Sequence, residues 1–263
     1  MKRAPYLIII FIVFAAAFIY AQGDVLSSSL QGGIEELQRG YDEWNIERFH
    51  RAAEIFEGAI AQAPANYLPY YWKGVAQFHM ILFYYGDGER AKEEEKVKES
   101  LEAASATLEQ VIALNENDSE SYALLGVITG MKIAEQPVSA IWLGSKVMKY
   151  KKRALESDPE NPRVHYLTGT SYYHASGILG GREKSLEHFL AAEKFYEQER
   201  GAGKGPVQPQ WGYSACLAFT AKVYAKGGDE QRAEAYYIKA LRVNPNDKLA
   251  QKGLADLKDM HRK

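Results

Sequence analysis

Small and large apolar residues recur at fixed intervals in two stretches of the chain, one near each end. In each stretch, a small residue is followed by an aromatic residue after four positions, a second small residue after three and a proline after five. The positions are Ala52, Phe56, Ala59 and Pro64 in the first stretch, and Ala233, Tyr237, Ala240 and Pro245 in the second. Intervals of three and four place side chains on one face of a helix, and proline stops a helix. The pattern therefore predicts helices that pack small residues against large ones and then end.

Weaker versions of this pattern divide most of the chain into five repeats. We place the repeats at residues 33–66, 67–118, 119–161, 162–213 and 214–247, with a capping helix over 248–263. Their starts are separated by 34, 52, 43 and 52 residues, so the array is irregular. Residues 22–32 are interpreted as a linker that precedes the first repeat.

The regular unit of 34 residues resembles the tetratricopeptide repeat. Gly40 and Ala221 stand where that repeat has a small residue in its first helix, and the Ala–aromatic–Ala–Pro series stands in the second. The resemblance covers about residues 33–263. It implies an all-α fold, namely a right-handed superhelical solenoid of about five helix-turn-helix units plus a C-terminal capping helix. The stretch from Pro159 to Gly212 is also similar to bacterial periplasmic repeat proteins of uncharacterised role, some of which accompany tripartite transporters.

The three middle repeats exceed the regular unit by 18, 9 and 18 residues. The first insertion carries a charged run, residues 89–96, which predicts a solvated extension of the second helix in a hairpin around 78–98. Pro137 predicts a break in the first helix of the third repeat, after which residues 140–143 restart an apolar face. Residues 201–210 are rich in Gly and Pro and are interpreted as a mobile linker.

The first residues of the chain have the pattern of a secretory signal peptide. Lys2 and Arg3 precede an apolar run over 6–21, which ends in the small residue Ala21 before Gln22. The run is short for a membrane span, which needs about 20 apolar residues. We therefore expect an exported protein of the periplasm or cell envelope, with residues 1–21 removed. An uncleaved N-terminal membrane anchor is the alternative, and no other part of the chain is expected to contact a membrane.

Charge and cysteine content narrow the function classes. Without Lys2 and Arg3 the chain has 30 basic and 34 acidic side chains, and its formal net charge changes from −2 to −4. Nucleic-acid binding calls for a basic stripe, so we expect no nucleic-acid partner. The one cysteine, Cys216, lies in an apolar helical context and is interpreted as a buried structural thiol rather than a nucleophile.

The resemblance implies that the first helices of successive repeats line a concave groove. Counting along the face next to the packing residues, we predict a groove for a peptide or other ligand lined by Tyr41, Trp44, Tyr71, Phe78, Arg163, Tyr166 and Tyr173. Aromatic rings provide large contact areas, and an arginine can hold a carboxylate with two parallel hydrogen bonds. The same rings at helical spacing also suit a protein core, so the groove is either open or filled by the chain's own insertions.

Motifs for catalysis are lacking in the sequence. His165, His174 and His188 fall in one repeat, but none of them forms the i,i+4 pair of a metal-binding helix. We expect no metal, no cofactor and no enzymatic activity. The predicted function is binding of a peptide or partner protein on the aromatic groove, and the alternative is a small apolar ligand or transporter substrate in an enclosed cavity. The oligomeric state is left open.

Overall fold

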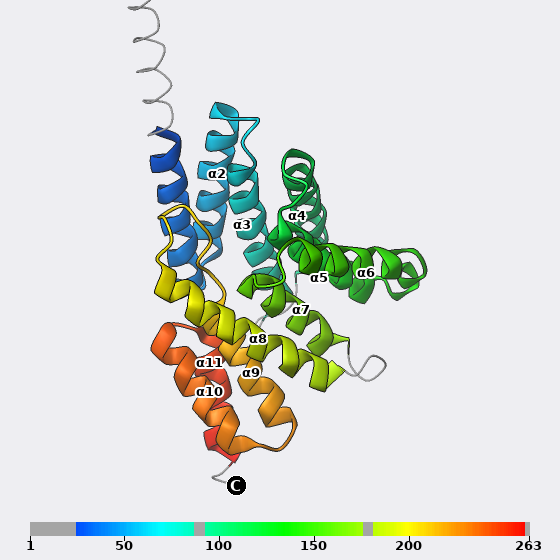
Figure 1. The fold of residues 1–263 in the computed structure, drawn as a ribbon, viewed down its shortest axis with the longest axis vertical. Helices are drawn as coiled ribbons and strands as arrows, with labels where there is room; N and C mark the ends of the chain where they lie inside the picture. Colours follow the sequence, from blue (N-terminus) through cyan, green and yellow to red (C-terminus); the bar gives the residue numbers. More distant parts are fainter. Residues whose placement is uncertain (1–24, 87–92, 176–180, 261–263) are drawn as a thin grey trace, which may run out of the picture.

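The computed structural model of the protein describes residues 25–86, 93–175 and 181–260. All regular structure in these ranges is helical, and consecutive helices pack in pairs along a curved array (Figure 1). The pairs are residues 25–43 with α2 (Ile46–Gln62), α3 (Tyr67–Tyr85) with α4 (Glu94–Leu114), α5 (Ser119–Glu135) with α6 (Ala140–Ser157), α7 (Pro162–His174) with α8 (Gly181–Ala202), and α9 (Tyr213–Lys226) with α10 (Glu230–Val243), followed by α11 (Lys248–Met260). This is the all-α solenoid that the resemblance to the tetratricopeptide repeat implies.

The helices begin at a recurring kind of cap. Asn45, Asn66, Asp118, Asn161 and Asp229 each precede a helix, and their side-chain oxygens accept backbone hydrogen bonds whose shortest members measure 2.8–3.0 Å. Such a cap satisfies an N–H group that the helix itself leaves without a partner, and contributes about 1 kcal/mol. Asn and Asp residues therefore start helices both between repeats and within them.

Small residues lie where paired helices cross. A Cβ atom added to Gly74 would lie 2.6 Å from Leu108, and one added to Gly169 would lie 2.6 Å from the Phe189 ring. The pattern residue Phe56 is fully buried, as are its two alanine neighbours in the series. Close approach at the small residue lets the large one enter the helix interface, which is the packing that the spacing predicts.

The first helix is longer than the first repeat predicted from the sequence. Residues 25–32, which we interpreted as part of a linker, are helical and continue into residues 33–43. Leu30 and Leu37 are both buried, at 2% and 5% exposure, so the apolar face of this helix begins before Gly33. The predicted signal peptide, residues 1–21, lies outside the described residues. Among the helices that are described, none is both long enough and apolar enough to span a membrane.

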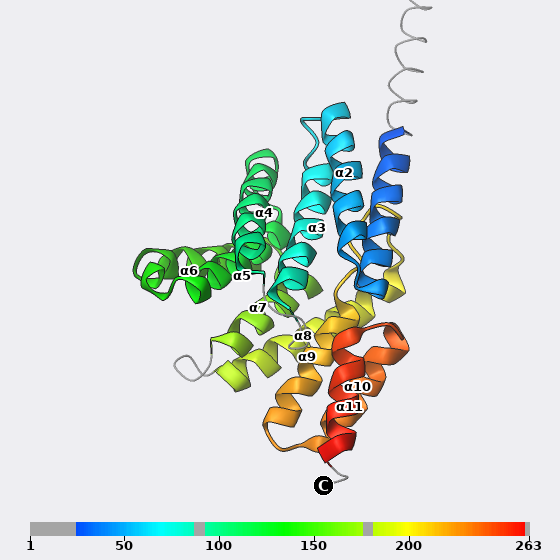
Figure 2. The same cartoon turned by 180° about the vertical axis from the view of Figure 1, so that it is seen from behind.

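The first two insertions mainly lengthen and break helices. The helices α3 and α4 have 19 and 21 residues, and the charged residues Glu94–Lys96 form the first turn of α4. Part of the predicted hairpin, residues 87–92, lies outside the described residues. In the third repeat α5 ends at Glu135, a 3-10 turn η1 (Pro137–Ser139) follows, and α6 begins at Ala140. The restarted apolar face is exposed, with Ile141 at 82% and Trp142 at 58%, and α6 projects sideways from the body (Figures 1 and 2).

The segment interpreted as a mobile linker is held against the N-terminal half of the array. Its first two residues belong to the end of α8. Beyond them, the indole Nε1 of Trp72 donates a hydrogen bond of 2.9 Å to the carbonyl of Val207. Just after the segment, the indole of Trp211 donates a second hydrogen bond, also 2.9 Å, to the hydroxyl of Tyr71. Two tryptophans therefore connect residues 203–212 to α3, which the composition of the segment does not reveal.

The two ends of the array meet. The hydroxyl of Tyr41, in the first helix, donates a hydrogen bond of 2.7 Å to Asp247, which directly precedes α11. The side-chain amide of Asn244 donates to Asp42 at 2.9 Å. Both views show the first helix reaching the top of α10 and α11 (Figures 1 and 2). In a simple solenoid each repeat contacts only its neighbours, so these contacts close the concave side of this one.

Candidate functional site

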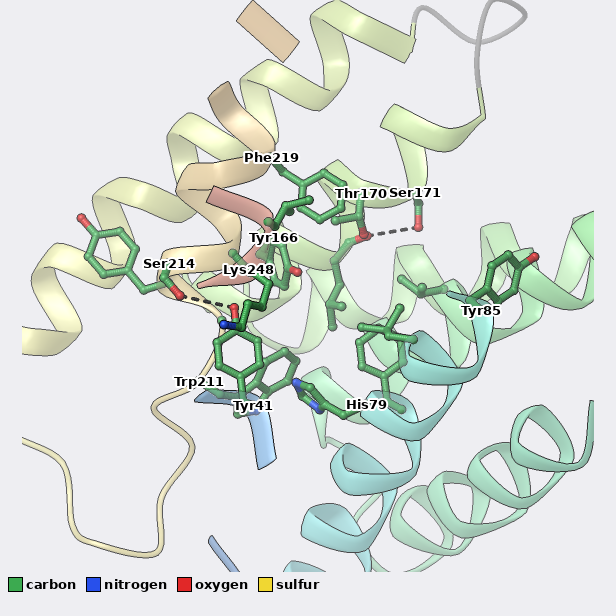
Figure 3. Close-up of a pocket in the computed structure, with 18 of the residues that line it drawn as sticks. Tyr41, His79, Tyr85, Tyr166, Thr170, Ser171, Trp211, Ser214, Phe219 and Lys248 are labelled. Carbon is green, nitrogen blue, oxygen red and sulfur yellow. Dashed lines mark hydrogen bonds between the residues drawn. The ribbon is translucent and has the colours of Figure 1, made fainter. Parts of the chain in front are cut away.

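The closed concave side holds a cavity of about 1840 Å³. The first helices of the repeats (residues 25–43, α3, α5, α7 and α9) supply most of its wall, and α6, α10, α11 and residues 206–212 add to it. Aromatic side chains from distant parts of the chain point into one region of it (Figure 3). The central helices form the wall because their outer faces are covered by the second helices of each pair.

A cluster of rings surrounds His79, in the C-terminal half of α3. The His79 ring centroid lies 5.8 Å from that of Tyr41, 5.6 Å from Phe49 and 6.1 Å from Trp211. His79 donates its Nδ1–H to the carbonyl of Val75 at 2.9 Å, and burial lowers its pKa. The imidazole is therefore neutral at physiological pH and acts as one more flat apolar surface in the cluster.

The wall also contains a strained turn. Trp44, between the first helix and α2, has a φ angle of 51°, in the left-handed region that costs a non-glycine residue about 1 kcal/mol or more. This conformation brings its ring to 6.4 Å from Tyr41 and 6.0 Å from Phe83. The strain is thus located at the cavity wall, where it extends the aromatic cluster toward α3.

Four of the seven predicted groove residues line the cavity, namely Tyr41, Trp44, Phe78 and Tyr166. The other three do not. Tyr71 is buried at 1% exposure beneath Trp211, and Tyr173 packs edge-on against Phe219 at 5.6 Å. The structure thus brings together the predicted aromatic residues of the first helix, of α3 and of the start of α7.

Arg163, the predicted cation of the groove, lies in the protein interior. Its exposure is 0%, and its guanidinium donates to Glu120 at 2.6 Å and to both oxygens of Glu199 at 2.9 and 2.6 Å. Tyr71 donates a further hydrogen bond to Glu120. Although burial acts to raise the pKa of Glu199, the hydrogen bond from Arg163 lowers it. Arg163 therefore holds a carboxylate bidentately, as an arginine can, but the carboxylate belongs to the protein itself.

Several lining residues have no counterpart in the predicted groove. Among them are His79, Lys151, Trp211, Phe219 and residues of α11. Trp211 directly follows the segment interpreted as a linker, and α11 reaches the wall because the array closes on itself. A tryptophan next to a glycine was the only local signal for a role of Trp211. The sequence carries no local signal that α11 would line the cavity.

The three histidines of the fourth repeat do not form a metal site within the described residues, where no three His, Cys, Asp or Glu side chains are grouped suitably. The Nδ1 atoms of His165 and His188 are 3.1 Å apart, and Nε2 of His165 donates to the carbonyl of Pro159 at 2.9 Å. Cys216 is fully buried, and burial raises the pKa of its thiol. It is therefore a thiol at physiological pH, which is the less nucleophilic form.

A family model described as a tetratricopeptide repeat matches residues 37–79. Among solved structures, the thermophilic TPR protein TTC0263 of Thermus thermophilus is 18% identical and superimposes with a TM-score of 0.58, over 86% of this chain and 98% of that one. YrrB, a TPR protein with an unusual peptide-binding site, gives a TM-score of 0.39 at 17% identity, over 88% of this chain and 96% of its own. MamA (residues 41 to the end) from Desulfovibrio magneticus RS-1 gives 0.39 at 13% identity, over 84% and 97%.

The Thermus thermophilus structure supports the fold, whereas the other two superimpose too loosely to add to this conclusion. No protein with a curated description matches the sequence. The matched family model covers the end of the first helix, α2 and most of α3, and the same pairing of helices continues through α10. The family model identifies a tetratricopeptide repeat at residues 37–79, and the Thermus thermophilus structure shows that the chain as a whole has the fold of a TPR protein.

Proposed function

We propose that this protein is a non-catalytic binding protein that holds a peptide, or a segment of a partner protein, in the concave cavity. The observation that carries the proposal is the size of the cavity, about 1840 Å³. Pockets for small molecules usually measure roughly 300–1,000 Å³, so this one has room for several residues of an extended chain. Helical repeat proteins use their concave surfaces for binding.

The chemistry of the wall supports the same proposal. Rings such as Trp44, Phe78 and Trp211 offer flat apolar area that loses little side-chain entropy on binding. Polar groups stand among them, including the hydroxyl of Ser214 and the ammonium groups of Lys151 and Lys222. A peptide presents apolar side chains and polar groups in alternation, and such a mixed wall complements both.

The partial enclosure of the cavity favours a second candidate, a small apolar ligand or transporter substrate. The hydrogen bond between Tyr41 and Asp247 closes one side of the array, and residues 203–212 cover the N-terminal part of the concave face. An enclosed ligand of this kind would survive purification. Native mass spectrometry of the purified protein separates the two candidates, because the small-ligand proposal requires a bound mass and the peptide proposal does not.

We propose further that the protein acts outside the cytoplasm. The support is the pattern of Lys2, Arg3 and the apolar run over 6–21. Expression in a bacterial host followed by fractionation tests this, with a mature chain beginning at Gln22 in the periplasmic fraction as the expected result. A chain retained in the membrane at full length supports the anchor, and a full-length cytosolic chain contradicts export.

Glycines on either side of the array allow a matched test of the binding cavity. Gly130 lines the cavity and Gly58 lies on the exposed face of α2, and a Cβ atom added to either would have no other atom within 4 Å. The side chain of a Gly130→Trp variant therefore begins in open space at the cavity wall, and Gly58→Trp adds the same ring elsewhere. In a crosslinked pull-down from the envelope fraction, we expect the partner to be lost with Gly130→Trp and kept with Gly58→Trp. Equal capture by both variants contradicts the proposal.

A further inference from the structure

A buried lysine on the cavity wall lacks an acidic partner. Lys151, near the end of α6, is 8% exposed and lines the cavity. Its stem packs at the position of Gly126 on α5, and its Nζ lies 3.5 Å from the centroid of the Tyr172 ring on α7. Within the described residues, its ammonium group forms no ion pair. A cation–π contact stabilises a cation only in part.

Two further bases, Lys184 and His188, contact the same Tyr172 ring. The Nζ of Lys184, on α8, lies 5.4 Å from the same Tyr172 ring. His188, also on α8, stacks on that ring with a centroid distance of 5.5 Å and an angle of 13° between the planes. Burial and the charge of Lys184 lower the pKa of Lys151 to about 8. Burial, together with His165 and the two lysines, lowers the pKa of His188 to about 4.

Arg163 is a buried cation with a structural role, and unlike Lys151 it has acidic partners. That guanidinium meets the carboxylates of Glu120 and Glu199. By contrast, the acidic residues of the cavity lining, Glu35, Glu43 and Asp256, belong to the first helix and α11 and make no ion pair with Lys151. Burying a charge without a partner is costly. An anion bound beside Lys151 would therefore stabilise its ammonium group.

We propose that Lys151, assisted by Lys184, is the anion subsite of the cavity, where it binds the acidic group of a ligand whose apolar part lies on the aromatic wall. The chemical class is an amphipathic organic anion, a carboxylate, sulfonate or phosphate attached to an aromatic or aliphatic body. On a peptide this corresponds to an acidic residue flanked by apolar ones. The inference rests on the proposed binding function and specifies which part of the cavity receives the charge.

Two fluorescent probes that share one ring system test the subsite. 1-Anilinonaphthalene-8-sulfonate carries a sulfonate, whereas N-phenyl-1-naphthylamine is the same body without it. At pH 7 and fixed ionic strength, we expect the wild-type protein to bind the sulfonate roughly tenfold more tightly, the ratio of about one charge-assisted hydrogen bond. The Lys151→Met variant should lose this preference while still binding the neutral probe. Lys149→Met, which removes an exposed lysine from the same helix, should keep it.

The outcomes separate the subsite from the cavity. If the wild-type protein binds both probes equally, or if Lys151→Met keeps the preference, the anion subsite is wrong and the cavity stands. If neither probe binds, the binding cavity is wrong and the subsite with it. A cooperative melting transition in each variant, measured in the same buffer, ensures that the probes report on folded protein. We expect Lys151→Met to melt at the same temperature as the wild type or higher, because it replaces a buried cation by an apolar side chain of similar size.

Discussion

The hydroxyl of Tyr41 donates a hydrogen bond of 2.7 Å to the carboxylate of Asp247, 206 positions later in the chain. Asp247 is fully buried, and its other oxygen accepts from the backbone N–H of Ala250 at 3.0 Å in the first turn of α11. One carboxylate therefore both caps the last helix and joins it to the first. The array closes through this residue, and the closure converts a concave face into a cavity.

The Tyr41→Phe variant tests the closing contact. It removes the donor and leaves a buried carboxylate oxygen without that partner, so we expect a loss of about 1–3 kcal/mol in the free energy of unfolding. Urea denaturation followed by circular dichroism measures the change. Tyr70→Phe is the control, since the hydroxyl of Tyr70 makes only an exposed hydrogen bond of 3.3 Å to Pro64. Equal effects of the two variants would contradict the importance of the closure.

Arg163 tests whether the buried ion pairs are structural. Arg163→Met leaves Glu120 buried without its cation and leaves Glu199 with Lys204 alone, at 2.8 Å, and we expect a destabilisation of about 3–5 kcal/mol. Replacing both glutamates by glutamine in the same chain should restore much of this loss, because no uncompensated charge then remains. Denaturation of the single and triple variants measures it. If Arg163→Met were as stable as the wild type, the structural role of Arg163 would be contradicted, and the sequence-based prediction that Arg163 binds a ligand would be favoured.

A pair of glycines tests the packing of the repeats. Gly169→Ala places a methyl group 2.6 Å from Phe189, and overpacking of this kind usually costs about 1–3 kcal/mol. Gly58→Ala meets open space in a helix, where alanine is favoured over glycine by up to about 1 kcal/mol. We therefore expect thermal melts to shift downward for the first variant and not for the second. Melts that shift together would mean that the Gly169 crossing is looser than its geometry indicates.

The stability of the protein should depend on the charge of Lys151. Burial and Lys184 lower its pKa to about 8 from the ordinary value of 10.5. Between these two values the unfolded chain binds more protons at this site than the folded protein does, so stability rises with pH across that window. His188 is neutral throughout and contributes nothing there, because its pKa is about 4. Denaturation curves from pH 7 to 10.5 should show the wild type gaining stability relative to Lys151→Met, and a constant difference would contradict the lowered pKa.

The fold follows from local patterns, and for that reason it could be predicted. Phe56 and Tyr237 with their alanine neighbours report only on how two adjacent helices cross, and such contacts repeat along the chain. The position of α11 against the first helix could not be predicted in this way. It depends on the sum of the crossing angles of all the helices that lie between them, and no local pattern around Tyr41 or Asp247 contains that sum.

The candidate site could be predicted in part for the same reason. Tyr41, Trp44, Phe78 and Tyr166 were found because the first helices of such repeats face the concave side. Arg163 was placed there too, although its partners Glu120 and Glu199 lie 43 and 36 positions away and only the folded chain brings them to it. Lys151 was missed because it lies on a second helix, and the second helices of such repeats are expected to lie on the outer side of the array.

Photo-crosslinking from inside the cavity is the most direct test of the central claim, that the concave cavity is where a ligand binds. Met131 on α5 lines the cavity, whereas Leu190 on α8 does not line it and is 38% exposed. A photoreactive amino acid replaces each residue in turn in otherwise wild-type protein, and intact cells are irradiated. We predict that position 131 yields a discrete crosslinked product that position 190 does not. A product from position 190 and none from position 131 would contradict the account.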